Sequence, residues 1–209
     1  MKFNEGIELT MNKFIIASVL TTSLIFGYLG YSTVHQKTSE DLDIETVHAS
    51  WGDEYTEVES LFKDSDLVVV ATLSKELNSY QPFEGHEDTF TDGEIRIIES
   101  IKNEGNKDAV IVSQYGGKRV DGKIEVFEDL PLLRKDKKYL LFLEKIEDNT
   151  DRNDKYQTVR GVQGFYTLSE SFTYLESNEQ LKGTVNGFIN RAVIEKGIHG
   201  LREMSGKYN

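Results

Sequence analysis

The sequence predicts a mainly β, antiparallel domain, with one helix before its strands and an amphipathic helix at the C-terminus. Short apolar runs alternate with turn residues along most of the chain, without the alternating strand and helix patterns of a parallel sheet. Asp121-Gly122 is a strong hairpin dipeptide with strand-like residues on both sides. The last apolar pattern, over residues 184–196, has helical periodicity.

Each element follows from its local pattern. Apolar residues at helical spacing between Tyr55 and Phe62 predict a helix over residues 53–63. Residues 67–73 form a continuous apolar run, which is typical of a strand buried on both faces. The closing helix is followed by Gly197, a residue type favoured just past a helix end. The other predicted strands cover residues 93–101, 109–112, 139–143, 156–159, 165–168 and 172–175.

The N-terminal region contains a long uncharged stretch, residues 14–34, directly after Lys13. A helix of about 20 residues rises roughly 30 Å, which matches the hydrocarbon core of a bilayer. The lysine predicts that residues 1–13 stay in the cytoplasm and that the later chain is extracytoplasmic. Two interpretations remain for the stretch. It is a signal peptide cleaved near Ser32, which gives a secreted protein, or an uncleaved transmembrane signal anchor at the cell membrane.

Apart from the apolar stretch, the sequence predicts a possible start at Met11, a spacer and one folded domain. Met11 is a possible true start, because Lys13 and the apolar stretch then form an ordinary export signal. Residues 35–52 are polar and lack strong periodicity, so we interpret them as a spacer. Residues 53–209 then form the extracytoplasmic β-domain with its C-terminal helix. A domain of this size buries roughly two-thirds of its unfolded surface and needs no disulfide or metal to fold.

The composition excludes several kinds of site. The chain has 36 acidic and 24 basic residues and a net charge of −12, so nucleic acid is not an expected partner. It contains no cysteine, which excludes disulfides, thiolate metal sites, a cysteine nucleophile and a lipoprotein anchor. Hydrophobic residues make up 38% and charged residues 29% of the chain, as in globular proteins.

No catalytic residue, metal site or cofactor is predicted, because each candidate has a simpler structural interpretation. His86 lies in an acidic loop, and no H-E-x-x-H zinc motif or G-x-S-x-G nucleophile motif occurs. Residues 148–154 are rich in Asp and Asn but lack the glycine and closing glutamate of an EF-hand, which favours a turn. Gly116-Gly117-Lys118 lacks the other residues of a phosphate loop. The basic residues over 134–138 are expected as solubilising charges before a buried strand, with an anionic wall polymer or lipid headgroup site as the alternative.

The order of five segments carries a resemblance to known proteins. The segments are SDLVVVATL, GEIRIIESIKNEG, AVIVSQYGG, LPLLRKDKKYLLFLEK and GVQGFYTL. Over residues 53–170, their order resembles a family of exported Firmicute proteins and, more distantly, netrin-like domains and tissue inhibitors of metalloproteases. The resemblance implies an OB-like, netrin-like barrel, a fold that binds through one face and its rim loops. Those inhibitors place an N-terminal cysteine on the target's zinc, so a chain without cysteine is not expected to inhibit by that route.

These observations predict an extracytoplasmic, non-catalytic binding or interaction domain. It is tethered to the membrane through residues 14–34 or secreted, and its expected ligand is an envelope protein or a peptide segment. Tyr115, Gly116, Gly117 and Arg119 are the predicted binding residues, on the rim of the barrel. Two alternatives remain: a cell-wall-associated hydrolase that uses a carboxylate pair, and a structural or regulatory partner of a neighbouring membrane protein.

Overall fold

The computed structural model describes residues 43–48, 54–103, 107–127, 130–168 and 185–208. The predicted membrane or signal segment (residues 14–34) lies outside these residues, as does the strand predicted at residues 172–175. Within the described ranges, no helix is both long and apolar enough to cross a bilayer. The export signal therefore stays a prediction.

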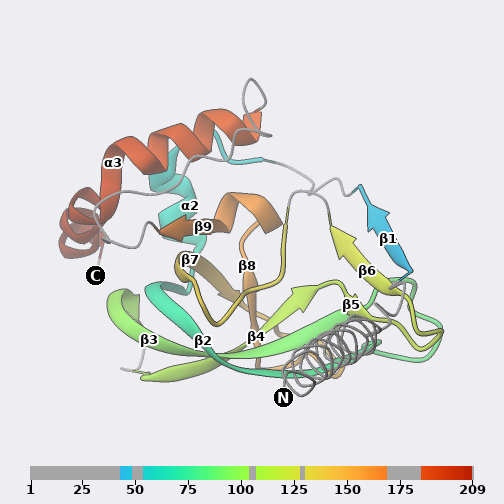
Figure 1. The fold of residues 1–209 in the computed structure, drawn as a ribbon. Coiled ribbons are helices and arrows are strands. Elements are labelled where there is room, and N and C mark those ends of the chain that lie inside the picture. Colours follow the sequence, from blue (N-terminus) through green and yellow to red (C-terminus); the bar gives the residue numbers. More distant parts are fainter. Residues whose placement is uncertain (1–42, 49–53, 104–106, 128–129, 169–184, 209) are drawn as a thin grey trace, which may run out of the picture. The chain divides into compact units, whose positions relative to one another are not determined.

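A closed barrel of five strands forms the centre of the described domain (Figure 1). The strands pair in the order β2–β3–β4–β8–β7, and β7 returns to β2 to close the barrel. The pairs are antiparallel except β4 and β8, which run parallel where Val112 faces Tyr156. The mainly β prediction is confirmed, and this order is consistent with an OB-like barrel. The strands are β2 (Leu67–Tyr80), β3 (Phe90–Asn103), β4 (Ala109–Tyr115), β7 (Lys138–Lys145) and β8 (Tyr156–Thr158), with β9 (Phe165–Leu168) added beside β7.

The apolar run at the start of β2 is buried on both faces, as its sequence predicts. Leu67, Val69 and Ala71 belong to the apolar cluster inside the barrel. Val68 and Val70 belong to a second apolar cluster, which the barrel shares with the helices. Successive side chains of a strand point to opposite faces, so a continuous apolar run is what a strand between two cores requires.

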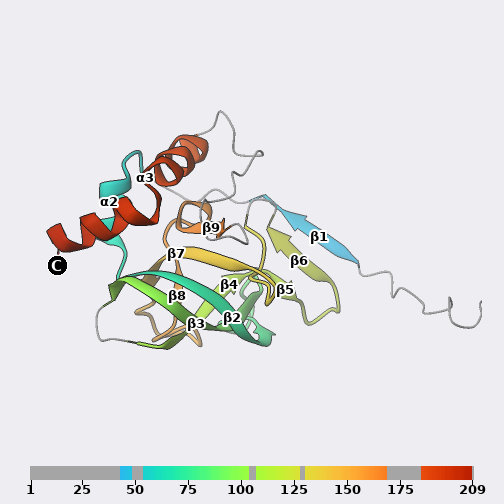
Figure 2. The ribbon, with the colours of Figure 1, turned by 60° about the vertical axis from the view of Figure 1, so that its left-hand side comes forward.

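Two helices cover one side of the barrel, which we call the helix side (Figures 1 and 2). They are α2 (Val58–Asp64) and α3 (Val185–Tyr208). The helix predicted over residues 53–63 starts later than expected. Tyr55 precedes it in an extended segment, where its backbone exchanges two hydrogen bonds with the amide of the buried Gln163 in η1 (Gly161–Gly164). These bonds replace the helical turn that the spacing of Tyr55 predicts.

The predicted C-terminal helix is present, but helical structure resumes after an interruption at Gly197. That residue has φ 62° and ψ 175°, which interrupts the helical backbone, and a further helical stretch continues to Tyr208. A left-handed φ suits glycine at a helix end, as predicted. The interruption lets both parts of α3 pack on the barrel, because Ile189 and Val193 before it and Leu201 after it are all fully buried.

A lysine at the end of β3 fixes α2 on the barrel. The Lys102 ammonium donates hydrogen bonds to the carbonyl oxygens of Phe62, Lys63 and Ser65, at 3.1, 2.9 and 2.5 Å. The last carbonyl groups of a helix have no partner within the helix and carry partial negative charge. Lys102, part of the segment that carries the family resemblance, therefore has a structural role here.

A small second sheet lies on the opposite side of the barrel, which we call the hairpin side (Figures 1 and 2). Its order is β1 (Ile44–Val47), β6 (Ile124–Phe127), β5 (Gly117–Lys118), with β1 parallel to β6. The hairpin predicted at Asp121-Gly122 joins β5 to β6, with Gly122 at φ 90°. Four residues of the segment interpreted as a spacer, Ile44–Val47, form β1. Its pattern Ile-Glu-Thr-Val alternates over only four residues, which is too short to predict a strand.

Candidate binding groove

An open groove of about 510 Å³ lies on the hairpin side, between the end of β2 and the β5–β6 hairpin. Its volume is in the range of small-ligand sites. The end of β2 and the loop that follows form one wall, the hairpin forms the other, and Thr89 belongs to the lining near the start of β3. The lining residues are Leu77, Asn78, Ser79, Tyr80, Gln81, Thr89, Lys118, Arg119 and Val120.

The groove runs along the edge of β2. Residues 77–80 are consecutive in β2, and consecutive side chains of a strand point to opposite faces, so a surface that all four line is the strand's edge. β2 pairs with β7 only from Leu67 to Thr72. From Leu73 to Tyr80, no strand among the described residues pairs with that edge. Ser74, Leu77 and Asn78 have no partner in the β3 register, and such bulges bend a strand away from its neighbour.

The only charged residues in the lining are cations. Arg119 pairs with Glu45 (3.4 Å), Asp121 (3.4 Å) and Glu125 (3.5 Å). Glu125 is only 2% exposed, and its other carboxylate oxygen accepts a hydrogen bond of 3.0 Å from the backbone N–H of Thr89. The charge of Arg119 is thus largely neutralised, and the arginine joins β1, β6 and the hairpin turn.

Lys118 is the available cation of the groove. Its backbone N–H donates to the Ser79 hydroxyl at 2.9 Å, which fixes the start of the hairpin against β2. The residue is exposed, and its ammonium has no ion pair with a described carboxylate. An anionic group bound in the groove would therefore face one un-neutralised positive charge.

Two of the predicted binding residues are needed for close packing. Gly116 and Gly117 have φ 94° and φ 131°, a backbone region that favours glycine. A Cβ on Gly117 would collide with the hydroxyls of Ser79 and Thr91, and one on Gly116 with the Glu125 carbonyl. The Gly116 N–H donates to the Thr89 carbonyl at 2.7 Å. These glycines bring the hairpin against the barrel and do not line the groove.

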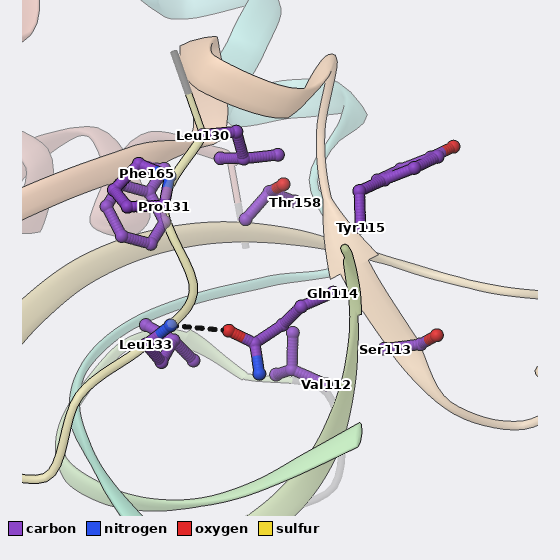
Figure 3. Close-up of a pocket in the computed structure, with 9 residues that line it drawn as sticks. All are labelled: Val112, Ser113, Gln114, Tyr115, Leu130, Pro131, Leu133, Thr158 and Phe165. Carbon is purple, nitrogen blue, oxygen red and sulfur yellow. Dashed lines mark hydrogen bonds between the residues drawn. The ribbon is translucent and has the colours of Figure 1, made fainter. Parts of the chain in front are cut away.

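Tyr115 is one of the residues that line a second, smaller cleft. Figure 3 shows an apolar cleft between the end of β4 and the segment from Leu130 to Leu133, lined also by Thr158 and Phe165. Its volume is about 10 Å³, enough for about one water molecule. Within it, the Gln114 side-chain oxygen accepts a 2.6 Å hydrogen bond from the Leu133 backbone N–H. We interpret this cleft as a packing gap where the chain closes over the barrel.

A network of buried polar side chains lies beside the groove, among the end of β2, the start of β3 and the end of β4. The guanidinium carbon of Arg152 lies 4.0 Å from the centre of the Phe90 ring and 5.3 Å from that of Tyr115. Its Nε donates to the Ser113 hydroxyl at 3.1 Å, and a second nitrogen donates to Gln157. Cation–π contacts of a desolvated arginine stabilise such a site by about 2 kcal/mol.

The same network continues to Lys155. Its ammonium lies 2.6 Å from the Asp92 carboxylate and 3.1 Å from the Tyr80 hydroxyl, which itself donates to Asp92 at 2.8 Å. Burial raises the pKa of Tyr80. Burial opposes the charge on Lys155, but the hydrogen bonds to Asp92 and Tyr80 outweigh it, so the pKa of Lys155 is raised. Tyr80 also lines the groove, so the network holds one groove wall in place.

The other sequence candidates have structural roles. The Asp88 N–H donates to Nδ1 of His86 at 3.1 Å, and the loop stacks the imidazole against Phe83 and Phe90. In the turn of residues 148–154, the Asp148 carboxylate accepts bonds from both the N–H and the hydroxyl of Thr150. No group of three metal-ligating side chains occurs in the part of the chain that is described.

Sequence reasoning found one groove residue, Arg119, and missed most of the others. No strand was predicted between residues 73 and 93, because the end of β2 is polar and lacks strand alternation. Asp92 and Lys155 are 63 residues apart, and Ser113 and Arg152 are 39 apart, so no local pattern connects them.

The chain matches no protein-family model, and no curated protein sequence matches it significantly.

Proposed function

We propose that this chain is an extracytoplasmic binding domain with a netrin-like, OB-like barrel, exported by its N-terminal apolar segment and held at the membrane or secreted. The observation that carries the proposal is the groove of about 510 Å³ with an available cation, Lys118. Its walls are rigid, because Glu125, Arg119 and the network around Asp92 fix both sides. A preformed groove binds at a low cost in conformational entropy.

No observation favours the alternative hydrolase. Asp92 and Glu125 are the buried acidic residues in the described part of the chain. Each is held by a cation of the protein, Lys155 or Arg119, and each also accepts a hydrogen bond from a fixed group. Carboxylates engaged in this way are structural, since an acid–base pair needs open access to its substrate.

The location is tested in intact cells. The full-length chain with a C-terminal tag is expressed in Gram-positive cells, which are converted to protoplasts and treated with external protease. We expect loss of the tag in intact protoplasts or its release into the medium. A full-length protein in the soluble cytosolic fraction, protected from the protease, would contradict the proposal.

The binding role is tested by cross-linking in the same cells. A photo-reactive residue at Val120, on the groove wall and 90% exposed, should give a discrete adduct. Lys118→Glu should reduce that adduct several-fold. Arg119→Glu is less informative, because it would place a second carboxylate beside the buried Glu125. Lys207→Glu, an exposed lysine at the end of α3, is the matched control and should leave the adduct unchanged.

A further inference from the structure

We infer that the ligand of the groove is an extended peptide with an acidic side chain, which adds as a strand to the free edge of β2. This inference rests on the proposed binding function and names the chemistry of the partner. It stands on three features of the described residues: the unpaired edge, the shape of the groove beside it, and the charge of its lining.

The unpaired edge gives the main-chain interactions. β2 continues for eight residues, Leu73 to Tyr80, after its pairing with β7 ends at Thr72. Eight strand residues span roughly 26 Å, enough to pair with a peptide of similar length. Peptides that add to a sheet edge gain their affinity from main-chain hydrogen bonds, which do not depend on sequence.

The groove explains why this edge is accessible to a peptide and protected from other sheets. The β5–β6 hairpin contacts β2 at Ser79, and the groove beside this contact is lined by residues 77–81 and by residues 118–120. Native proteins protect exposed edges with charges and bulges, and β2 has both, with exposed Lys75 and Glu76 and register shifts around Leu77. A single strand fits this groove, whereas the edge of a second sheet would meet the hairpin.

The charge of the lining selects an acidic peptide. Arg119 is occupied by three carboxylates, so Lys118 is the cation left for a ligand. Leu77 and the 90% exposed Val120 add apolar surface beside it. In an added strand, successive side chains point to alternate faces. A peptide with one acidic residue can therefore pair with Lys118, while its apolar or β-branched neighbours contact Leu77 and Val120.

The test begins with selection. Phage-displayed random octapeptides are selected on the purified full-length chain in detergent micelles, after circular dichroism and a cooperative urea transition show that it is folded. An enriched peptide is then synthesised with a fluorescein label, and its Kd is measured by fluorescence anisotropy at low and high salt. We expect enriched sequences with at least one acidic residue between β-branched residues, and no proline at their centre.

Two changes then separate strand addition from other binding. A copy of the peptide methylated at alternate backbone nitrogens keeps every side chain but loses main-chain donors, and we expect its affinity to fall at least about tenfold. Lys118→Glu should weaken the unmodified peptide about tenfold and reduce its salt dependence, while Lys207→Glu should have no effect. Both protein variants replace exposed residues, and their urea transitions check that they fold.

The outcomes are distinct. A peptide that binds equally well after methylation or equally well to Lys118→Glu overturns the inference, as does the absence of any enriched peptide. Binding of poly(glycerol phosphate) that depends on Lys118, without peptide enrichment, assigns the groove to an anionic polymer and also overturns it. If the in-cell adduct at Val120 forms while peptides fail, the proposed function stands alone. If neither the adduct nor an enriched peptide is found, the proposed function and the inference are both contradicted.

Discussion

On the helix side of the barrel, fully buried residues such as Phe62, Phe142 and Ile189 contact apolar neighbours. On the hairpin side, the buried residues include Asp92, Glu125 and Arg152. Apolar burial is strong and non-directional, whereas a buried charge is tolerated only if its partners are placed with the right geometry. We infer that apolar burial stabilises the helix side, whereas paired charges fix the shape of the groove on the hairpin side.

This contrast predicts that the largest loss of stability comes from the helix side. Phe142→Ala, in the central strand β7, should reduce the free energy of unfolding by about 3–5 kcal/mol, because it removes a large side chain and leaves a cavity. Urea denaturation followed by circular dichroism measures the change. Val120→Ala on the hairpin should stay within about 0.5 kcal/mol of the wild type. Similar losses for the two variants would contradict the contrast.

On the hairpin side, the free energy of unfolding should fall when a buried hydrogen-bond donor is removed. Arg152→Met keeps an unbranched side chain but leaves Ser113 and Gln157 without their donor, and should cost about 1–3 kcal/mol. Arg134→Met is the matched control, because that arginine is exposed and its guanidinium pairs with Asp136, two residues away. Its expected change is near zero.

Hydrogen exchange locates the effect of Arg152→Met. Amide protection should fall first in residues 146–155 and 81–89, which meet through the Asp151 N–H and the Pro82 carbonyl. A uniform loss of protection, with α2 and α3 affected equally, would show that the two sides of the barrel are not stabilised separately.

The same division explains how much of the molecule could be predicted. The apolar runs at residues 67–73, 139–143 and 165–168 each became a strand, because their burial alone decides their structure. The hairpin at Asp121-Gly122 was predicted from its turn chemistry. Closure of the barrel was not predictable from local pattern, since β2 and β7 pair at a separation of about 70 residues.

The groove was predictable only in part. Arg119 lines the groove, but its three carboxylate partners come from β1, the turn and β6, and the residues of β1 were interpreted as a spacer. The polar end of β2 gave no strand signal, because an edge strand in water needs no apolar alternation. Interactions that depend on tertiary geometry leave no periodic pattern in the sequence.

A smaller change in the free energy of unfolding is expected at the Tyr166 hydroxyl, a polar group within the apolar cluster of the helix side. The Tyr166 hydroxyl is buried without a hydrogen-bond partner among the described residues, and burial raises its pKa. Tyr166→Phe should therefore increase the free energy of unfolding by about 1 kcal/mol, because it removes a desolvated group. Tyr156→Phe is the matched control and should decrease it, since the Tyr156 hydroxyl accepts a hydrogen bond from Lys107. The urea midpoints of both variants measure these changes.

The smallest effect should appear in alkali, at Tyr55 in the segment that precedes α2. Burial, together with a 2.7 Å hydrogen bond to Asp64, raises the pKa of Tyr55 from 10.0 to about 12. A raised pKa means that the folded state holds this proton more tightly than the unfolded chain. The resulting stabilisation is complete below pH 10.0 and is lost as the pH rises to about 12. Tyr55→Phe should remove the latest step of the tyrosinate absorbance titration and flatten the fall in stability over that interval. An unchanged titration would show that Tyr55 ionises as it does in water, and that its bond to Asp64 does not hold the segment in solution.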